Sequence, residues 1–303
     1  MLAAVVKVLA TRRYPGPAFE ELDVEVLPLD ALASARNDVE GLIVANEEVP
    51  LESFPRLRVV ANFGVGYDRV DVRACAARGI VVTNTPGVLD DATADLAFAL
   101  ILAARRRLVE GDRLVRSGGW AGAWSEGTLA EEVTGSTLGI VGLGRIGTAV
   151  ARRARGFELR VLYTQRRQLE TDLGEFRELD ELLAESDIVS IHAPLTTATT
   201  GLVDERRLAL LRNGACLVNT ARGEIVDEPA LVRELVSGRI HGGLDVFAYE
   251  PRVPPELLGL PNVVLTPHLG SATRQTREAM TRLVVDNLLA VERGESPLTP
   301  VGA

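Results

Sequence analysis

Short apolar runs alternate along the chain with amphipathic stretches of helical period. In the first third, runs rich in valine, isoleucine and leucine predict strands near residues 5–11, 41–46, 57–64 and 79–84. Six later runs predict strands near residues 137–144, 159–164, 187–194, 215–220, 242–247 and 262–268. Continuously apolar strands that alternate with helices are typical of parallel sheets with helices on both faces. The pattern therefore predicts an α/β protein.

Two longer stretches have a helical pattern. Residues 92–116 begin apolar and end rich in arginine, which predicts one long helix between the two groups of strands. Residues 271–294 predict the last helix, because Gly294 and Pro297 provide a stop signal. Residues 117–135 are rich in glycine and alanine and predict a loop.

Length and charge narrow the classes of function. A chain of 303 residues suggests about two domains, and a hydrophobic content of 47% is ample for their cores. The net charge of -9 and the lack of a long basic run argue against a nucleic-acid partner. Lys7 is the only lysine, which argues against Schiff-base chemistry and against a P-loop.

The cysteines and the first residues indicate the compartment. Cys75 and Cys216 are far apart and in no paired metal pattern, so we expect reduced thiols and no metal site. The apolar run at the start of the sequence is too short for a membrane span and is better interpreted as a strand than as a signal. We expect a cytoplasmic protein with no membrane partner.

A glycine loop follows the predicted strand at 137–144. Gly142, Gly144 and Gly147 form G-x-G-x-x-G between a strand and a helix, which is the context of a dinucleotide site. The first glycine allows a tight turn, the second allows the backbone to approach the pyrophosphate, and the third allows close packing of helix and strand. The expected cofactor contacts here are Gly142, Leu143, Gly144, Arg145, Ile146 and Gly147.

The end of the next predicted strand favours NADPH. An acid that binds the ribose of NAD is expected about 20 residues after the loop, but Thr164 stands there, followed by Gln165, Arg166 and Arg167. Guanidinium groups pair well with a 2′-phosphate, which a carboxylate would repel. The alternative is that both arginines belong to a solvated loop. We expect NADPH as cofactor, with NADH less favoured.

Three histidines are candidates for proton transfer. His241 precedes a buried strand and is expected to be structural, and His192 is expected to line the nucleotide pocket. His268 ends a predicted strand, where ligands bind in open parallel sheets, and Gly270 and Ser271 leave room beside it. His268 is therefore the expected proton donor.

Two charged residues at strand ends complete this arrangement. Arg222 can hold a carboxylate through two hydrogen bonds, and Glu250 beside His268 would stabilise the imidazolium. Singly, each could be an ordinary surface residue. Together with His268 they provide a substrate anchor, an acid and a group that orients the acid.

Several segments also carry a family resemblance. FGVGYDRVD, TNTPGVLDDATADLAFALILAA, the glycine loop, NTARGEIVDEPAL, GGLDVFAYEP and TPHLGSAT occur in this order. Over essentially the whole chain they resemble the D-isomer-specific 2-hydroxyacid dehydrogenases, above all the glyoxylate/hydroxypyruvate reductases and the similar 2-ketogluconate reductases. An arginine just after the second strand is usual among the NADPH users of that branch.

The resemblance implies roles for individual residues. Arg222, Glu250 and His268 match the catalytic triad, and backbone N–H groups of Val65 and Gly66 match those that bind the substrate carboxylate, with Ser271 as a further substrate contact. The remaining expected cofactor contacts are His192, Pro194, Thr220, Ala221, Arg222, Asp245, His268 and Gly270.

The resemblance also implies an architecture and a partner. It predicts two Rossmann-like, doubly wound parallel-sheet domains with an active-site cleft between them: a substrate-binding domain of residues 1–93 plus 280–303, and an NAD(P)-binding domain of residues 94–279. A homodimer through the nucleotide-binding domains is expected. Ser136 stands where the family usually has lysine, and the roles of Trp120 and Trp124 stay open.

The hypothesis is an NADPH-preferring oxidoreductase that reduces small 2-oxo acids to D-2-hydroxy acids, with His268 as proton donor. Glyoxylate and hydroxypyruvate are the expected substrates, and 2-ketogluconate is a further candidate. Two alternatives stay open: an NAD-dependent phosphoglycerate or phosphite dehydrogenase, and a dinucleotide-sensing binding module similar to a co-repressor.

Overall fold

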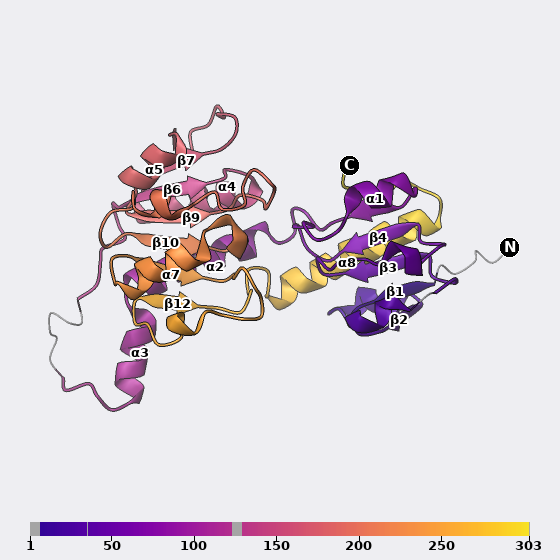
Figure 1. The fold of residues 1–303 in the computed structure, drawn as a ribbon, viewed down its shortest axis with the longest axis horizontal. Helices are drawn as coiled ribbons and strands as arrows, with labels where there is room; N and C mark the ends of the chain where they lie inside the picture. Colours follow the sequence, from indigo (N-terminus) through magenta and orange to yellow (C-terminus); the bar gives the residue numbers. More distant parts are fainter. Residues whose placement is uncertain (1–6, 35, 123–128, 303) are drawn as a thin grey trace. The chain divides into compact units, whose positions relative to one another are not determined.

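The chain folds into two compact units, each built on a parallel sheet (Figure 1). The computed structural model describes residues 7–34, 36–122 and 129–302. Unit 1 is Met1–Leu89 with Ser271–Ala303, and unit 2 is Asp90–Gly270. The units separate at the first residue of one helix and three residues before another. The domain limits expected from the sequence, 93/94 and 279/280, fall inside these helices.

Unit 1 contains a five-stranded sheet in the order β2-β1-β3-β4-β5, with every neighbouring pair parallel. Its strands are β1 (Val8–Ala10), β2 (Val24–Val26), β3 (Gly41–Val44), β4 (Val59–Asn62) and β5 (Val81–Thr83). Its helices are α1 (Val72–Ala77) and α8 (Arg274–Glu292), with 3-10 turns η1 (Pro17–Glu21), η2 (Leu29–Ala33) and η3 (Leu51–Ser53).

Alternating side chains bury both faces of this sheet. Leu42 and Val60 point into a core that also contains Phe54 from the η3 turn and Cys75 from α1. On the other face α8 packs against β4 and buries a stripe that includes Val284. A helix that is apolar on one stripe covers a sheet in this way, because the opposite face of the helix stays polar.

Lys7 stands just before β1, and its side chain is partly exposed. Its ammonium group lies 2.7 Å from an Asp38 carboxylate oxygen and 3.4 Å from Glu25. Arg36 binds the same Glu25 carboxylate through two nitrogens. The hydrogen bond to Asp38 is the main cause that raises the pKa of Lys7.

Unit 2 contains a seven-stranded parallel sheet in the order β12-β11-β10-β9-β6-β7-β8. Its strands are β6 (Thr137–Val141), β7 (Arg160–Thr164), β8 (Glu175–Phe176), β9 (Ile188–Ile191), β10 (Cys216–Asn219), β11 (His241–Leu244) and β12 (Val263–Leu265). Its helices are α2 (Asp90–Arg105), α3 (Leu108–Arg116), α4 (Arg145–Ala154), α5 (Leu179–Glu185), α6 (Glu205–Leu208) and α7 (Glu228–Val236). Within the described residues of unit 2, the 3-10 turns are η5 (Arg155–Phe157), η6 (Gly223–Ile225) and η7 (Pro255–Leu257).

The strands of unit 2 divide their side chains between two cores. Leu217 of β10 joins a cluster with α5, α6 and α7, while its neighbours Cys216 and Val218 join a cluster with α2 and α4. Because successive side chains of a strand point to opposite faces, a fully apolar strand needs helices on both sides. The predicted doubly wound α/β fold is confirmed.

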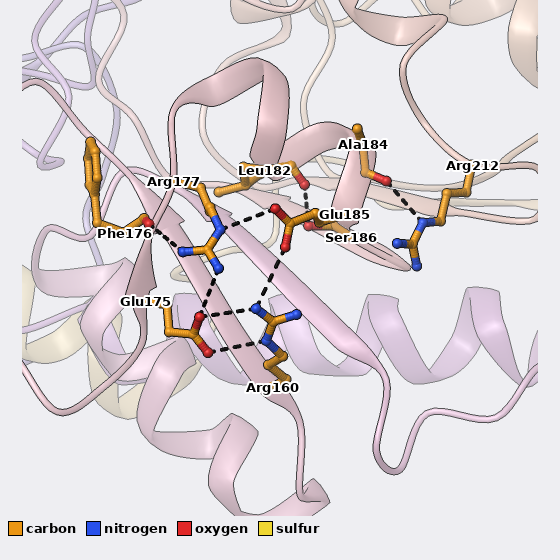
Figure 2. Close-up of polar contacts among 9 residues, drawn as sticks. All are labelled: Arg160, Glu175, Phe176, Arg177, Leu182, Ala184, Glu185, Ser186 and Arg212. Atoms are coloured by element: carbon orange, nitrogen blue, oxygen red, sulfur yellow. Dashed lines mark hydrogen bonds and ion pairs between the residues drawn. The ribbon is translucent and has the colours of Figure 1, made fainter.

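All ten predicted strands are present, and two more were missed. β2 has the sequence VEV and β8 only EF, so neither has an apolar run long enough to detect. β8 is an edge strand, and Figure 2 shows the ion pairs beside it: Glu175 binds Arg160 at 3.0 Å and Arg177 at 2.9 Å. Charges at a sheet edge discourage pairing with another chain.

The single helix expected over residues 92–116 is wrong. α2 ends at Arg105 and α3 begins at Leu108, because Arg107 adopts a left-handed conformation with φ 54°. The Arg107 guanidinium binds both carboxylate oxygens of Glu110, at 2.7 and 2.5 Å, and so fixes the start of α3. The arginine-rich sequence concealed this break because arginine is itself a good helix former.

Both cysteines are buried free thiols, as expected, and burial raises the pKa of Cys216 to about 12. Within the described ranges, no group of three or more histidine, cysteine or acidic residues is arranged to hold a metal ion. None of the helices in those ranges is both long enough and apolar enough to cross a membrane. Trp124 lies outside the described residues.

Candidate active site

The strand order of unit 2 reverses between β6 and β9, and the glycine loop lies there. β6 pairs with β7 on one side and with β9 on the other, so the connections leave its carboxyl end in opposite directions. Ligands of open α/β sheets bind outside the carboxyl ends of strands at such a reversal. The glycine loop follows β6 and His192 follows β9.

Each glycine of the loop meets a different requirement. Gly142 has φ +96°, and a Cβ there would lie 2.8 Å from the Ala193 nitrogen. A Cβ on Gly147 would lie 2.1 Å from the Gly142 oxygen, so helix α4 approaches the loop too closely for any side chain. A Cβ on Gly144 would meet no atom within 4 Å. The first and third glycines are required because a side chain there would clash with neighbouring backbone atoms. The open space at Gly144 fits a pyrophosphate at the start of α4.

The end of β7 supports the remaining part of a dinucleotide site. Thr164 is buried, and its carbonyl accepts a hydrogen bond of 2.9 Å from the Gly142 N–H. Arg166 and Arg167 are exposed, and within the described part of the chain neither forms an ion pair. The Gln165 carboxamide donates to the Arg167 carbonyl at 2.6 Å and so folds the turn that carries them.

Two residues that follow neighbouring strands, His192 after β9 and Thr220 after β10, carry unusual polar groups. Loss of solvent lowers the pKa of His192 to about 4, so its ring is neutral near neutral pH, and its Nε2 lies 2.8 Å from the Ser190 hydroxyl. The buried Thr220 hydroxyl has no hydrogen-bond partner within the described residues. A buried hydroxyl without a partner is costly unless a ligand satisfies it. Both residues could therefore contact a bound nucleotide, and Pro194 lies exposed beyond His192.

His268 and Glu250 are in direct contact. The His268 Nδ1 lies 2.8 Å from the Glu250 Oε2, and the other carboxylate oxygen accepts the Phe247 N–H at 3.1 Å. Burial raises the pKa of Glu250, but the hydrogen bond and charge of His268 outweigh it, and the net shift is downward. Because an ionised carboxylate only accepts, Nδ1 carries the proton, and Nε2 is the ring nitrogen that Glu250 does not bind.

Asp245 shapes the turn that presents His268. Its carboxylate accepts hydrogen bonds from the Thr266 hydroxyl at 2.6 Å, the Leu269 N–H at 2.7 Å and the Gly270 N–H at 2.9 Å. These contacts hold His268 in a left-handed conformation with φ 54°, which is uncommon for a residue with a side chain. Burial is the main cause that raises the pKa of Asp245.

Arg222 follows β10 and lies near the same carboxylate. Its charge contributes to lowering the pKa of Glu250, and one of its nitrogens donates to the Ala221 carbonyl at 2.7 Å. Gly223 is required next to it, because a Cβ there would lie 2.1 Å from the Phe247 carbonyl carbon. Unit 2 therefore brings Arg222, Glu250 and His268 to the carboxyl ends of its strands.

The predicted substrate contacts other than Arg222 lie in unit 1. Val65 and Gly66 follow β4 in a partly buried turn, and Ser271 precedes α8, whose first turn is capped by Thr273. His241 begins β11, at the amino end of the sheet of unit 2, where burial lowers its pKa. His241 therefore lies at the amino ends of the strands, whereas His268 lies at their carboxyl ends.

Comparisons with known proteins identify the family of this chain. Residues 98–270 match the model of the D-isomer specific 2-hydroxyacid dehydrogenase, NAD binding domain. The glyoxylate reductase of Pyrococcus furiosus is 49% identical over 97% of this chain and 95% of its own length. The chain belongs to the D-isomer specific 2-hydroxyacid dehydrogenase family. It is therefore an oxidoreductase with a nucleotide-binding domain.

Solved structures of similar proteins extend the agreement to the whole chain. A protein from Thermus thermophilus has a TM-score of 0.91 and 44% identity, covering 98% of this chain and 100% of its own. The NADPH-dependent glyoxylate/hydroxypyruvate reductase of Sinorhizobium meliloti, in complex with NADP and malonate, has a TM-score of 0.90 and 39% identity. That match covers 99% of this chain and 97% of the other.

Sequence reasoning missed a second set of residues in this dehydrogenase. Asn62 and Asn219 are the last residues of β4 and β10, both are buried, and each bonds to the backbone of the turn that follows. The Asn219 carboxamide accepts from the Ala221 N–H at 3.0 Å and donates to the Arg222 carbonyl at 2.8 Å. An asparagine that ends an apolar strand ahead of a functional turn was the available signal.

Proposed function

We propose that this dehydrogenase is an NADPH-preferring reductase of small 2-oxo acids, with glyoxylate and hydroxypyruvate as its main substrates and D-2-hydroxy acids as its products. The observation that carries the proposal is the 2.8 Å contact between His268 and Glu250, with Arg222 close by at the carboxyl ends of the strands. The names of relatives that reduce glyoxylate or hydroxypyruvate support the choice of substrate. 2-Ketogluconate is a larger substrate worth testing.

The side chains have distinct roles in this mechanism. NADPH, when bound along the glycine loop, supplies a hydride to the substrate carbonyl carbon. His268 donates a proton from Nε2 to the carbonyl oxygen, and Glu250 holds the ring and stabilises its charged form. Arg222 and the N–H groups of Val65 and Gly66 bind the substrate carboxylate. Because charge develops on the oxygen in the transition state, cations beside it favour the reaction more than they favour binding.

Three residues at the end of β7 support NADPH as the preferred cofactor. Thr164 replaces a carboxylate that would repel the 2′-phosphate, and Arg166 and Arg167 are exposed cations that make no ion pair within the described ranges. The NADP complex of the Sinorhizobium meliloti relative is consistent with this preference. In this proposal unit 2 is the nucleotide-binding domain and unit 1 the substrate-binding domain.

The proposed assembly is a homodimer formed through unit 2. Leu108 and Val115 of α3 are 56% and 59% exposed and stand seven positions apart, on one side of the helix. Trp120 and Leu129, further along, are also exposed. Figure 1 shows α3 extending away from the rest of unit 2. An exposed apolar helix face of this kind fits a second copy of the chain. The proposed location, where NADPH is supplied, is the cytoplasm.

The decisive experiment follows the absorbance of reduced nicotinamide with purified protein and each of the three 2-oxo acids, with NADPH and separately with NADH. Faster oxidation of NADPH with glyoxylate or hydroxypyruvate is the expected result, and His268→Ala, which lacks the proton donor, serves as the blank. Activity on phosphoglycerate or phosphite with NAD would instead identify an NAD-dependent phosphoglycerate or phosphite dehydrogenase. Tight dinucleotide binding without turnover of any acid would favour the binding module.

A further inference from the structure

The turn after β4 has a distinctive pattern of hydrogen bonds. The carbonyl oxygens of Gly64 and Gly66 both accept from the Asn62 carboxamide, at 3.0 and 2.9 Å. The Val65 carbonyl accepts from the Asn84 carboxamide at 3.0 Å. Three successive carbonyls are therefore turned toward asparagine side chains.

The N–H groups of the same turn are left available. Across residues 7–34, 36–122 and 129–302, the N–H groups of Val65 and Gly66 have no acceptor within hydrogen-bonding distance. Peptide planes that turn their carbonyls inward direct their N–H groups outward, and successive N–H groups make an anion-binding concavity. The turn is thus preorganised for a carboxylate before any ligand arrives.

Asn62 has every polar atom of its side chain satisfied. It is fully buried, and besides its two donated bonds its Oδ1 accepts the Asn46 N–H at 2.7 Å. Asn46 is itself fixed in a left-handed conformation, where its side chain binds Asp68 at 2.9 Å and the Arg69 N–H at 3.0 Å. Only a carboxamide can both accept from one N–H and donate to two carbonyls at this position.

Asn84 is held by Thr299, which follows α8. Its carbonyl accepts from the Thr299 hydroxyl at 2.6 Å, and its N–H donates to the Thr299 carbonyl at 3.3 Å. The buried Asn287 of α8 in turn binds Thr299 through both its carboxamide atoms, at 2.9 and 3.0 Å. A continuous chain of hydrogen bonds therefore runs from α8 to the Val65 carbonyl.

From these contacts we infer that Asn62 and Asn84 are positioning residues for substrate binding: their carboxamides hold the Val65 and Gly66 N–H groups in the orientation that receives the carboxylate of a 2-oxo acid. The inference rests on the proposed function. Neither side chain needs to touch the substrate. Their effect is on affinity for the carboxylate, while His268 and Glu250, which belong to unit 2, keep their contact.

Aspartate is the informative substitution at both positions, because it has nearly the same size but cannot donate. Asn84→Asp loses the bond to the Val65 carbonyl, and we expect the KM for the 2-oxo acid to rise about tenfold. Asn62→Asp loses two bonds, and we expect a rise of about 100-fold. In both variants kcat should stay within about threefold, since loss of ground-state binding raises KM alone. The dissociation constant of NADPH should stay within about twofold.

Asn262→Asp is the matched control. Asn262, directly before β12 in unit 2, donates to the carbonyls of Leu235 and Ile240 at 2.9 and 2.8 Å, so its substitution costs two bonds of the same kind. We expect lower thermal stability without a change in KM. If Asn62→Asp does not fold, the half-buried Asn84→Asp decides alone. An unchanged KM in every folded variant, or an equal rise in Asn262→Asp, would overturn the inference.

Titration with oxalate separates this inference from the proposed function. Oxalate offers the carboxylate of a 2-oxo acid without turnover, and it is titrated into protein saturated with NADPH or NADH. If the wild-type chain reduces no 2-oxo acid, the proposed function fails. Weaker oxalate binding by Asn84→Asp than by wild type would still support the role of the asparagines. Failure of the wild-type chain to bind oxalate, or equal binding by both, would refute it.

Discussion

At the scale of single residues, the proposed proton transfer depends on the contact between Glu250 and His268. Glu250→Gln keeps an acceptor near Nδ1 but removes the negative charge that stabilises the imidazolium. We expect kcat to fall about 100-fold while the KM for NADPH stays within about twofold. Steady-state kinetics with saturating cofactor measure both quantities. A kcat unchanged by this substitution would show that Glu250 does not support the acid.

The arginine after β7 provides a second prediction. Arg166→Gly removes an exposed guanidinium that forms no ion pair within the described residues, so the fold should not suffer. We expect the KM for NADPH to rise about tenfold or more and the KM for NADH to change less than about twofold. The neighbouring exposed Gln168→Gly is the control for a more flexible turn. Equal losses with both cofactors would argue that Arg166 does not bind the 2′-phosphate.

His192 predicts a dependence of stability on pH. Its pKa is lowered from 6.5 to about 4, so the unfolded chain binds the extra proton first as the pH falls. The stability that His192 contributes is therefore complete above 6.5 and is lost as the pH approaches 4. Between about pH 7 and about pH 5, the free energy of unfolding should fall about 2 kcal/mol more in wild type than in His192→Gln. Chemical denaturation at the two pH values measures the difference, and identical pH dependence would contradict a lowered pKa of His192 in the folded chain.

At the scale of elements, two glycines of the glycine loop have different roles: Gly147 is needed for stability, and Gly144 is expected to be needed for NADPH binding. Gly147→Ala places a methyl group against the Gly142 carbonyl, and we expect it to lower the free energy of unfolding by about 3 kcal/mol. Gly144→Ala meets no atom within 4 Å, and its extended backbone tolerates alanine. It should keep the stability of wild type but bind NADPH about tenfold more weakly. Thermal melting and fluorescence titration test the pair, and normal NADPH binding by Gly144→Ala would place the pyrophosphate elsewhere.

Sequence periodicity predicted the elements whose side chains are buried on both faces. Every strand of the two parallel sheets with a continuous apolar run was found, because burial on two faces leaves no polar position to confuse the pattern. The break at Arg107 was not predictable, since it depends on a left-handed residue and a contact with Glu110 rather than on a helix-breaking residue type.

The site residues were predictable to different extents. Residues whose chemistry is visible in their side-chain type, such as His268, Glu250 and Arg222, could be named from their places at strand ends. Asn62 and Asn219 act through backbone groups two to four positions away, so their roles require the actual path of the turn. A periodic pattern carries no information about that path.

At the scale of the whole molecule, the exposed face of α3 predicts the oligomeric state. Val115→Glu places a charge on the apolar side of α3, and a charge buried in an interface without a partner is costly. We expect a homodimer for wild type and a monomer for this variant by light scattering after gel filtration. Val236→Glu, at an exposed position that ends α7, is the control and should stay dimeric. A dimer that survives Val115→Glu would show that α3 is not the interface.

The single lysine has a practical consequence. Reagents that acylate amines have one side-chain target in this chain, Lys7, which belongs to unit 1, whereas His268 and the glycine loop belong to unit 2. A fluorophore or a resin coupled at the Lys7 amine would leave the side chains of His268 and Glu250 unmodified. Because Asp38 holds the ammonium group in its charged form, coupling should need a more alkaline buffer than an isolated lysine does.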